Sequence, residues 1–128
     1  MSMDEGYLTN SVLRDMSAYV REVNYANGWF DRERTFGDDI ALLHSEVSEM
    51  LEAYREHGLE DFTDRSGNIG TVPENGPPKP EGVGSEAADL LIRLLDFCSR
   101  YDVELGTEFF RKMRYNATRG HRHGGKAL

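Results

Sequence analysis

The sequence predicts an all-α protein, arranged as a four-helix bundle-like subunit. Two observations support this prediction. Apolar residues recur at spacings of three and four in four separate stretches, and no segment shows the alternation of apolar and polar residues that is typical of a strand. At 128 residues the chain has the length of one ordinary domain, so residues 1–128 are expected to form a single domain.

The expected helices are separated by residues that start or stop helices. Asn10 or Ser11 is the expected N-cap of the first helix, and Gly58 follows the second at a position where glycine commonly ends a helix. The tail, residues 120–128, contains three glycines and is expected to be flexible. The four helices are expected over about residues 10–26, 38–57, 84–101 and 104–119.

A long segment rich in glycine and proline joins the second and third expected helices. Residues 59–82 contain four glycines and four prolines, which leaves no room for a helix. Loops of this length are uncommon in small domains and often have a function. We therefore expect an irregular connection here.

The charge of the chain is acidic overall and basic at one end. Fifteen Lys and Arg residues stand against 23 Asp and Glu, which counts against duplex nucleic acid as the main partner. Residues 111–128 nevertheless hold six Lys or Arg side chains and no acid. This basic end has three interpretations: a solvated helix end favoured by the helix dipole, an arm that binds nucleic acid, or a set of phosphate ligands folded over an acidic metal site.

Cysteine content and hydropathy exclude several other classes of protein. The single cysteine, Cys98, excludes an intramolecular disulfide framework and a Cys-rich zinc site, and its apolar surroundings predict a small buried side chain. The first residues are acidic and polar, unlike a signal peptide. No apolar run approaches the roughly 18 residues that a membrane-spanning helix needs. A cytoplasmic location without membrane contact is the expectation.

The third expected helix has an unusually narrow charged stripe. Its charged residues fall within an arc of roughly 80°, and most of the remaining surface is apolar. The stripe faces either a cleft or a partner, or it is a solvated stripe spanned by ion pairs between residues four apart. A helix that is apolar on nearly all other sides also predicts self-association into a homo-oligomer. The charged residues are Glu86, Asp89, Arg93, Asp96 and Arg100.

Two pairs of carboxylates with the same spacing lie on two different expected helices. Glu46 and Glu49 share one face of the second helix, and Glu86 and Asp89 share one face of the third. If these helices pack antiparallel, the four carboxylates converge. Four anions cannot share a pocket at neutral pH without cations, and ligand sets made only of oxygen favour Mg²⁺, with Mn²⁺ as a substitute.

These residues resemble a known family. The segments Glu46-Val-Ser-Glu49 and Glu86-Ala-Ala-Asp89 resemble the ExxE…ExxD motif of the MazG-like all-α nucleotide pyrophosphohydrolases, a group related to dimeric dUTPases and dCTP pyrophosphatases. The segment from Lys112 to Arg119 is similar to the K-x-x-x-N-x-x-R element of that family. The 36 residues between the two motifs exceed the usual family spacing.

The resemblance implies an enzyme that cleaves a nucleoside triphosphate to a nucleoside monophosphate and pyrophosphate, and that clears unwanted nucleotides. It implies that the four carboxylates hold Mg²⁺, with Glu46 and Glu49 taking part in catalysis. It further implies a dimer or tetramer with sites at subunit interfaces. The side chains that would meet the phosphates are Lys112, Asn116, Arg119, Arg122 and Arg93.

Two points stay open at this level. Trp29 and Phe36 are candidates for stacking on the nucleotide base, with packing beside the helices as the other interpretation. The alternative function is a non-catalytic helical module that binds nucleotide or a partner protein on the same scaffold.

Overall fold

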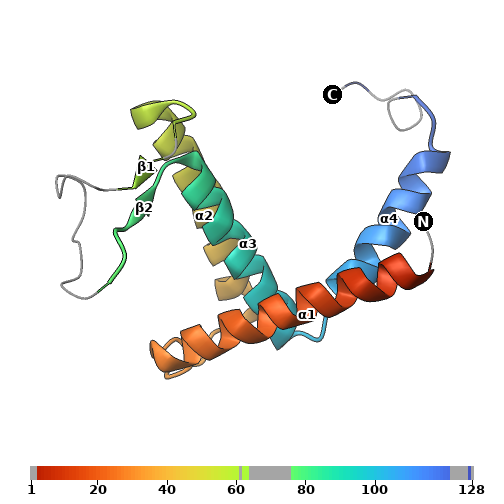
Figure 1. The fold of residues 1–128 in the computed structure, drawn as a ribbon, viewed down its shortest axis with the longest axis horizontal. Coiled ribbons are helices and arrows are strands. Elements are labelled where there is room, and N and C mark those ends of the chain that lie inside the picture. Colours follow the sequence, from red (N-terminus) through yellow and green to blue (C-terminus); the bar gives the residue numbers. More distant parts are fainter. Residues whose placement is uncertain (1–2, 61, 64–75, 122–126, 128) are drawn as a thin grey trace. The chain divides into compact units, whose positions relative to one another are not determined.

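We examined a computed structural model of the chain, which describes residues 3–60, 62–63, 76–121 and 127. The prediction of an all-α protein is confirmed, because helices make up nearly all of the regular structure in this part of the chain. Figure 1 shows the path of the chain through these elements. They are α1 (Met3–Ala26), α2 (Phe36–His57), β1 (Phe62–Thr63), β2 (Pro80–Glu81), α3 (Val83–Arg100) and α4 (Leu105–Thr118).

The chain forms two compact units. The first comprises Met1–Trp29 and Leu95–Leu128, and therefore holds α1, α4 and the last residues of α3. The second comprises Phe30–Leu94, and holds α2, the two short strands and most of α3.

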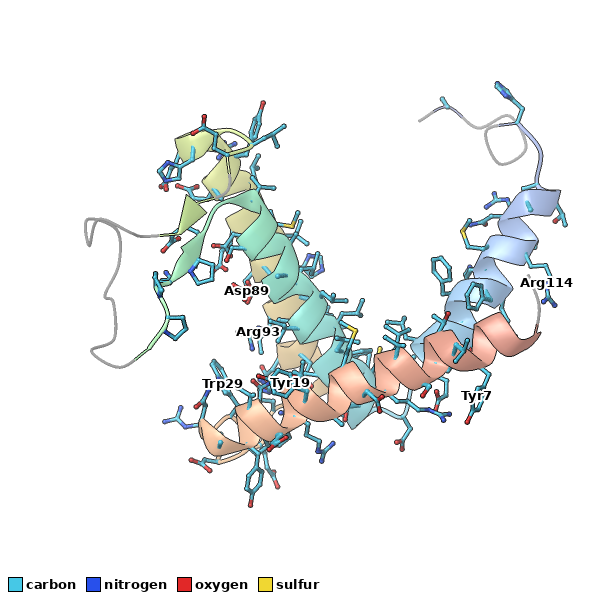
Figure 2. All side chains as sticks on the ribbon, viewed as in Figure 1. Tyr7, Tyr19, Trp29, Asp89, Arg93 and Arg114 are labelled. Atoms are coloured by element: carbon cyan, nitrogen blue, oxygen red, sulfur yellow. The ribbon has the colours of Figure 1, made fainter. Side chains whose placement is uncertain are left out.

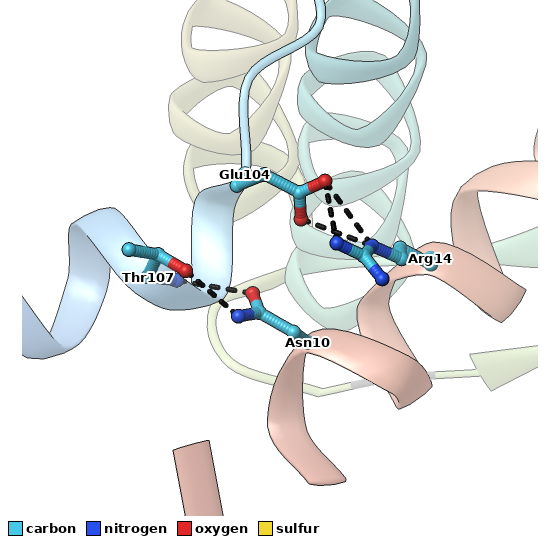
Figure 3. Close-up of polar contacts among 4 residues, drawn as sticks. All are labelled: Asn10, Arg14, Glu104 and Thr107. Atoms are coloured by element: carbon cyan, nitrogen blue, oxygen red, sulfur yellow. Dashed lines mark hydrogen bonds and ion pairs between the residues drawn. The ribbon is translucent and has the colours of Figure 1, made fainter. Parts of the chain in front are cut away.

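In the first unit, α1 and α4 run antiparallel and are joined by polar side chains. Asn10 Nδ2 donates a hydrogen bond to Thr107 Oγ1 at 2.7 Å, and Asn10 Oδ1 accepts one from the Thr107 N–H at 3.0 Å. One turn further along α1, Arg14 Nε donates to both carboxylate oxygens of Glu104, at 3.1 and 3.0 Å (Figure 3). Residue numbers rise along α1 as they fall along α4, so the two helices have opposite directions.

Asn10 caps a helix other than the expected one. Because α1 begins at Met3, Asn10 lies inside that helix rather than at its N-cap. The N-cap residue of α4, Glu104, makes no side-chain capping bond. Asn10 of α1 instead accepts a hydrogen bond from the first turn of α4, which satisfies one of the N–H groups that a helix start leaves without a partner.

Close packing at the start of α4 requires a residue without a side chain. Gly106 is buried, and a Cβ atom placed there would lie 3.2 Å from the backbone nitrogen of Asn10 and closer still to its side chain. Glycine at this position therefore allows α1 and α4 to approach each other closely enough for the Asn10–Thr107 hydrogen bonds.

In the second unit, α2 begins and ends with strong local signals. Thr35 Oγ1 accepts a hydrogen bond from the Asp38 N–H at 3.1 Å, and Asp38 Oδ2 accepts one from the Thr35 N–H at 2.9 Å, which makes a capping box. The helix ends before Gly58, as the sequence predicts, and the positive φ of 64° there is a backbone conformation that glycine adopts without strain. Arg34 also forms an ion pair at 3.0 Å with Asp39, which is buried.

The segment between α2 and α3, expected to be irregular, contains a short strand near each of its ends. Phe62 pairs with Glu81 and Thr63 with Pro80 in a short antiparallel ladder, which the sequence analysis did not foresee. Ser85 Oγ donates to Pro80 O at 3.2 Å and so ties β2 to the first turn of α3. Residues 64–75, most of the expected loop, lie outside the described residues.

Few apolar side chains are buried in the described part of the chain. Those that are buried are Val20, Ala53, Leu95 and Cys98, of which Leu95 alone is fully buried. The burial of Cys98 confirms the expectation of a small buried side chain at that position. This burial also raises the pKa of the Cys98 thiol. The large apolar side chains of α2 and α4 that are exposed are Phe36, Val47, Leu51, Tyr54, Phe109, Met113 and Tyr115.

Candidate functional site

Three carboxylates from two helices meet in the second unit. Glu46 comes from α2, Glu86 and Asp89 come from α3, and one oxygen of each lies within 4.8 Å of the others. We call these three residues the carboxylate cluster. Asp89 and Arg93, one helical turn apart, lie on the same side of α3 (Figure 2). The helices α2 and α3 run antiparallel, as the sequence-based prediction of converging carboxylates requires (Figure 1). Glu46 pairs with Arg93, while Glu49, further along α2, interacts with Glu86 and Asp89, which precede Arg93 on α3.

Glu46 is the buried member of the carboxylate cluster, with 6% of its surface exposed. Its Oε1 forms an ion pair with Arg93 Nε at 3.0 Å, and the Arg93 side chain is itself only 23% exposed. The second oxygen, Oε2, is buried and has no hydrogen-bond partner. A buried carboxylate oxygen without a partner is destabilising, so this atom marks a point where a cation would bind favourably.

Glu49 lies beside the cluster, one turn along α2 from Glu46, with its side chain exposed. The pKa of Glu49 is raised, first by the closeness of its carboxyl group to that of Glu46, then by burial and by the negative charges of Glu46, Glu86 and Asp89. Glu49 is therefore the fourth carboxylate predicted from sequence, and it is close enough to interact with the other three.

The two α3 carboxylates also resist ionisation. Burial raises the pKa of Glu86, and the charges of Asp89 and Glu46 add to this effect. Burial likewise raises the pKa of Asp89, with the charge of Glu46 next, while the positive charges of Arg93 and Lys79 act in the opposite direction. Each carboxylate makes ionisation of its neighbours less favourable, so at neutral pH the group favours a bound cation.

The donor atoms fit a hard divalent cation. Carboxylate oxygens are the only ligand type here, and the described residues bring no His or Cys into the cluster. Mg²⁺ and Mn²⁺ prefer such ligands, and Mg²⁺ usually binds one or two carboxylates together with water and substrate phosphates. The unpartnered Oε2 of Glu46 and the graded burial of the three carboxylates suit a site that holds a cation on its inner side and stays open on the other.

The sequence analysis assigned no role to Lys79, the residue that precedes β2. Lys79 Nζ forms an ion pair with Glu81 Oε1 at 3.0 Å, which raises the pKa of the lysine, and the charges of Glu86 and Asp89 raise it further. A signal for Lys79 in the sequence is the segment Pro78-Lys79-Pro80 shortly before α3, because the two prolines restrict the backbone on both sides of the lysine.

The residues of the predicted phosphate-binding element lie on α4 and just after it, in the first unit. Lys112 is exposed and Asn116 is half-buried. Arg119 follows the last residue of α4, and its guanidinium lies 5.5 Å from the centroid of the Tyr115 ring. Arg122 lies outside the described residues. The structure thus places the carboxylates and this element in different units, and it defines each group by itself.

The two candidate stacking residues are both largely exposed. Trp29 follows α1 in the first unit and is 45% exposed, and Phe36 is the first residue of α2 in the second unit and is 55% exposed. Neither side chain is buried in a core, and each leaves part of its ring accessible. Their stacking on a base stays a prediction.

A cavity of about 350 Å³ lies in the first unit, between α1 and the residues that join α3 to α4. It is lined by none of the four carboxylates Glu46, Glu49, Glu86 and Asp89. Two pairs of its polar side chains bind each other, since Arg21 donates to Ser99 Oγ at 3.1 Å and Arg14 pairs with Glu104. The carboxylate cluster is therefore a better candidate site than this cavity.

In the described residues, no helix is both long enough and apolar enough to cross a membrane. The chain matches no family model, no curated protein and no solved structure.

Proposed function

We propose that this protein is a Mg²⁺-dependent nucleoside triphosphate pyrophosphohydrolase of the MazG-like type, which converts a (d)NTP to a (d)NMP and pyrophosphate. The observation that carries the proposal is the buried carboxylate of Glu46, which lies beside Glu86 and Asp89 and has one buried oxygen outside its ion pair with Arg93. The order of the ExxE and ExxD motifs and the Lys112–Arg119 element support it.

The carboxylate cluster and Glu49 are the proposed metal ligands. Glu46, Glu86 and Asp89 lie close enough to share one cation, and Glu49 interacts with all three. When bound, Mg²⁺ supplies positive charge that polarises the phosphate chain. The carboxylates themselves hold that charge in place and keep it on the side of the unit where substrate arrives.

Glu49 is the proposed group that orients the attacking water. It is the exposed member of the α2 pair, so its carboxylate can reach a water molecule and accept its proton. Water oxygen forms a new bond to one phosphorus of the α–β bridge, and the bond from that phosphorus to the bridging oxygen breaks. The proton of the water passes to the carboxylate. Attack at the α-phosphorus makes pyrophosphate the leaving group, attack at the β-phosphorus makes it the nucleoside monophosphate, and the products are the same.

Side chains of α4 and the residues after it are the proposed phosphate contacts. Arginine binds two phosphate oxygens at once, lysine adds a mobile positive charge, and the amide of Asn116 can donate and accept. Trp29 and Phe36 remain the proposed stacking residues for the base. The proposed phosphate contacts are Lys112, Asn116, Arg119 and Arg122.

We also propose that the protein is a homo-oligomer. In the described part of the chain Leu95 is the only fully buried side chain, while Leu51 of α2 and Met113 of α4 are about half exposed. Apolar faces of this extent on several helices favour burial against a second copy. Light scattering at micromolar concentration should give at least twice the mass of one chain, and a monomeric mass would contradict this proposal.

The experiment that tests the reaction is product analysis of the wild-type protein with canonical and modified (d)NTPs. Nucleoside monophosphate and pyrophosphate should appear in equal amounts, with Mg²⁺ or Mn²⁺ required and chelation stopping the reaction. Release of orthophosphate and nucleoside diphosphate would show cleavage at another bond. A folded protein that binds Mg²⁺ and releases no product would instead be the non-catalytic binding module.

A further inference from the structure

Arg93 binds one oxygen of Glu46, a proposed metal ligand. Its Nε lies 3.0 Å from Oε1 of Glu46, and the two side chains are 23% and 8% exposed. Oε2 of the same carboxylate is buried and has no hydrogen-bond partner. The two oxygens of Glu46 therefore have different environments.

This arrangement is the one expected of a carboxylate that binds a metal with one oxygen and a hydrogen-bond donor, its outer partner, with the other. Carboxylates that bind metals are usually hydrogen-bonded on their other oxygen, and this partner fixes the orientation of the ligand. A guanidinium that donates from Nε to a largely buried carboxylate restricts rotation of that carboxylate more than water would. The fixed Glu46 then holds its carboxylate beside Glu86 and Asp89 before any cation arrives.

We propose that Arg93 is a positioning residue of the metal site, which acts through Glu46 and not as a phosphate ligand. This inference rests on the proposed function only in its assumption that the carboxylate cluster binds a divalent cation. It names a role for Arg93 that differs from the phosphate contact expected from sequence.

Substitution of Arg93 can distinguish two roles of this side chain, because they predict opposite changes in the affinity for a cation. Removal of a positive charge near a cation site should strengthen cation binding by simple electrostatics. Loss of the outer partner of a ligand should weaken metal binding by about 10- to 100-fold. The direction of the change in Mn²⁺ affinity therefore distinguishes the two roles.

The same helix offers a matched control. Arg100 Nε forms an ion pair with Asp96 Oδ2 at 2.8 Å, and these side chains are 17% and 7% exposed, close to the values for Arg93 and Glu46. Asp96 is not a member of the carboxylate cluster. Arg100→Gln therefore removes an ion pair of the same kind and similar burial, with no effect expected on a metal ligand.

The experiment is a titration of the full-length, metal-free protein with Mn²⁺, followed by electron paramagnetic resonance. Arg93→Gln should weaken Mn²⁺ binding by about 10- to 100-fold. Arg93→Lys keeps the charge but lacks the Nε donor, so it should also bind Mn²⁺ more weakly than wild type. Arg100→Gln should bind like wild type. Circular dichroism confirms that each variant is folded, and Arg93→Lys decides the test if Arg93→Gln does not fold.

Each outcome has a separate meaning. Unchanged or tighter Mn²⁺ binding by the folded Arg93 variants would overturn the positioning role and leave the metal site standing. Equal weakening by Arg93→Gln and Arg100→Gln would also overturn it, because the effect would then be a general loss of stability. If folded wild-type protein binds no Mn²⁺, the metal site itself fails and the positioning role fails with it.

Discussion

The α1–α4 contact and the carboxylate cluster use polar side chains in opposite ways. In the first unit, Asn10 and Arg14 of α1 each bind a specific partner on α4, and the donors and acceptors of these contacts are matched (Figure 3). In the second unit, three carboxylates lie together, burial raises the pKa of Glu86 and of Asp89, and one buried oxygen of Glu46 has no hydrogen-bond partner.

The difference separates contacts that stabilise the fold from a site that needs a ligand. A matched hydrogen bond contributes modestly to stability, whereas a gathered set of like charges lowers it until a cation binds. Variants of the α1–α4 contact should therefore change stability and leave metal binding alone. Variants of the carboxylates should change metal binding, with an effect on stability that depends on pH and on the bound cation.

The largest effect is expected for Glu46→Gln, which removes the charge of the buried ligand. Hydrolysis should fall at least about a hundredfold, because outer partners of metal ligands alone contribute about 10- to 100-fold. Pyrophosphate release by the folded variant is the measurement. Glu52→Gln is the matched control, since Glu52 lies on the same helix, is exposed and is not part of the cluster. Full activity in Glu46→Gln would remove Glu46 from the site.

A smaller effect on stability is expected for Asn10→Ala. The substitution deletes the side chain that caps α4, and loss of a cap typically costs about 1 kcal/mol in the free energy of unfolding. Urea denaturation measures this cost, with Ser11→Ala as the neighbouring control on α1. Affinity for Mn²⁺ should stay at the wild-type value. A drop in the metal affinity of folded Asn10→Ala would contradict the claim that the α1–α4 contact does not affect metal binding.

The smallest effect on stability is expected for Glu49→Gln, and it depends on pH. The pKa of Glu49 is raised in the folded, metal-free protein above the ordinary value of 4.5, so the folded state keeps the proton to a higher pH than the unfolded state. The carboxyl group therefore lowers stability progressively as the pH rises above 4.5. The variant should be slightly more stable than wild type at neutral pH and equally stable well below pH 4.5.

Thermal melting of metal-free protein across this pH range measures the difference between the two proteins. Mn²⁺ at neutral pH should reverse the order, because wild type then gains more from the bound cation than the variant does. A gap that stays constant from acid to neutral pH would show that the effect of Glu49→Gln does not come from ionisation.

The sequence predicted the parts of the fold and the site that depend on local spacing. Helical periodicity predicted the all-α class, and Gly58 predicted the end of α2. Residues three apart on a helix share a face, so the pairs Glu46/Glu49 and Glu86/Asp89 predicted a group of carboxylates. The geometry of that group agrees with the prediction, while its binding of metal stays a proposal.

Contacts between distant segments were beyond prediction from spacing. Nothing local to Asn10 indicates that it caps a helix 97 residues away in sequence, and the residue types alone favoured a cap for its own helix. In the same way, Arg93 could pair within α3 or across to α2, and only the packing of the two helices brings Glu46 to it. The pairing of β1 with β2 likewise depends on strand contacts that a segment rich in glycine and proline does not indicate.

The most direct test of this account is a Mn²⁺ titration of folded, metal-free wild-type protein, read by electron paramagnetic resonance. Mn²⁺ should bind saturably, Mg²⁺ should displace it, and Glu46→Gln should abolish the binding. Mn²⁺ at a hundred times its Kd should also raise the free energy of unfolding by about 2.7 kcal/mol. Absence of saturable binding, or equal binding by Glu46→Gln, would contradict the claim that these carboxylates form a metal site.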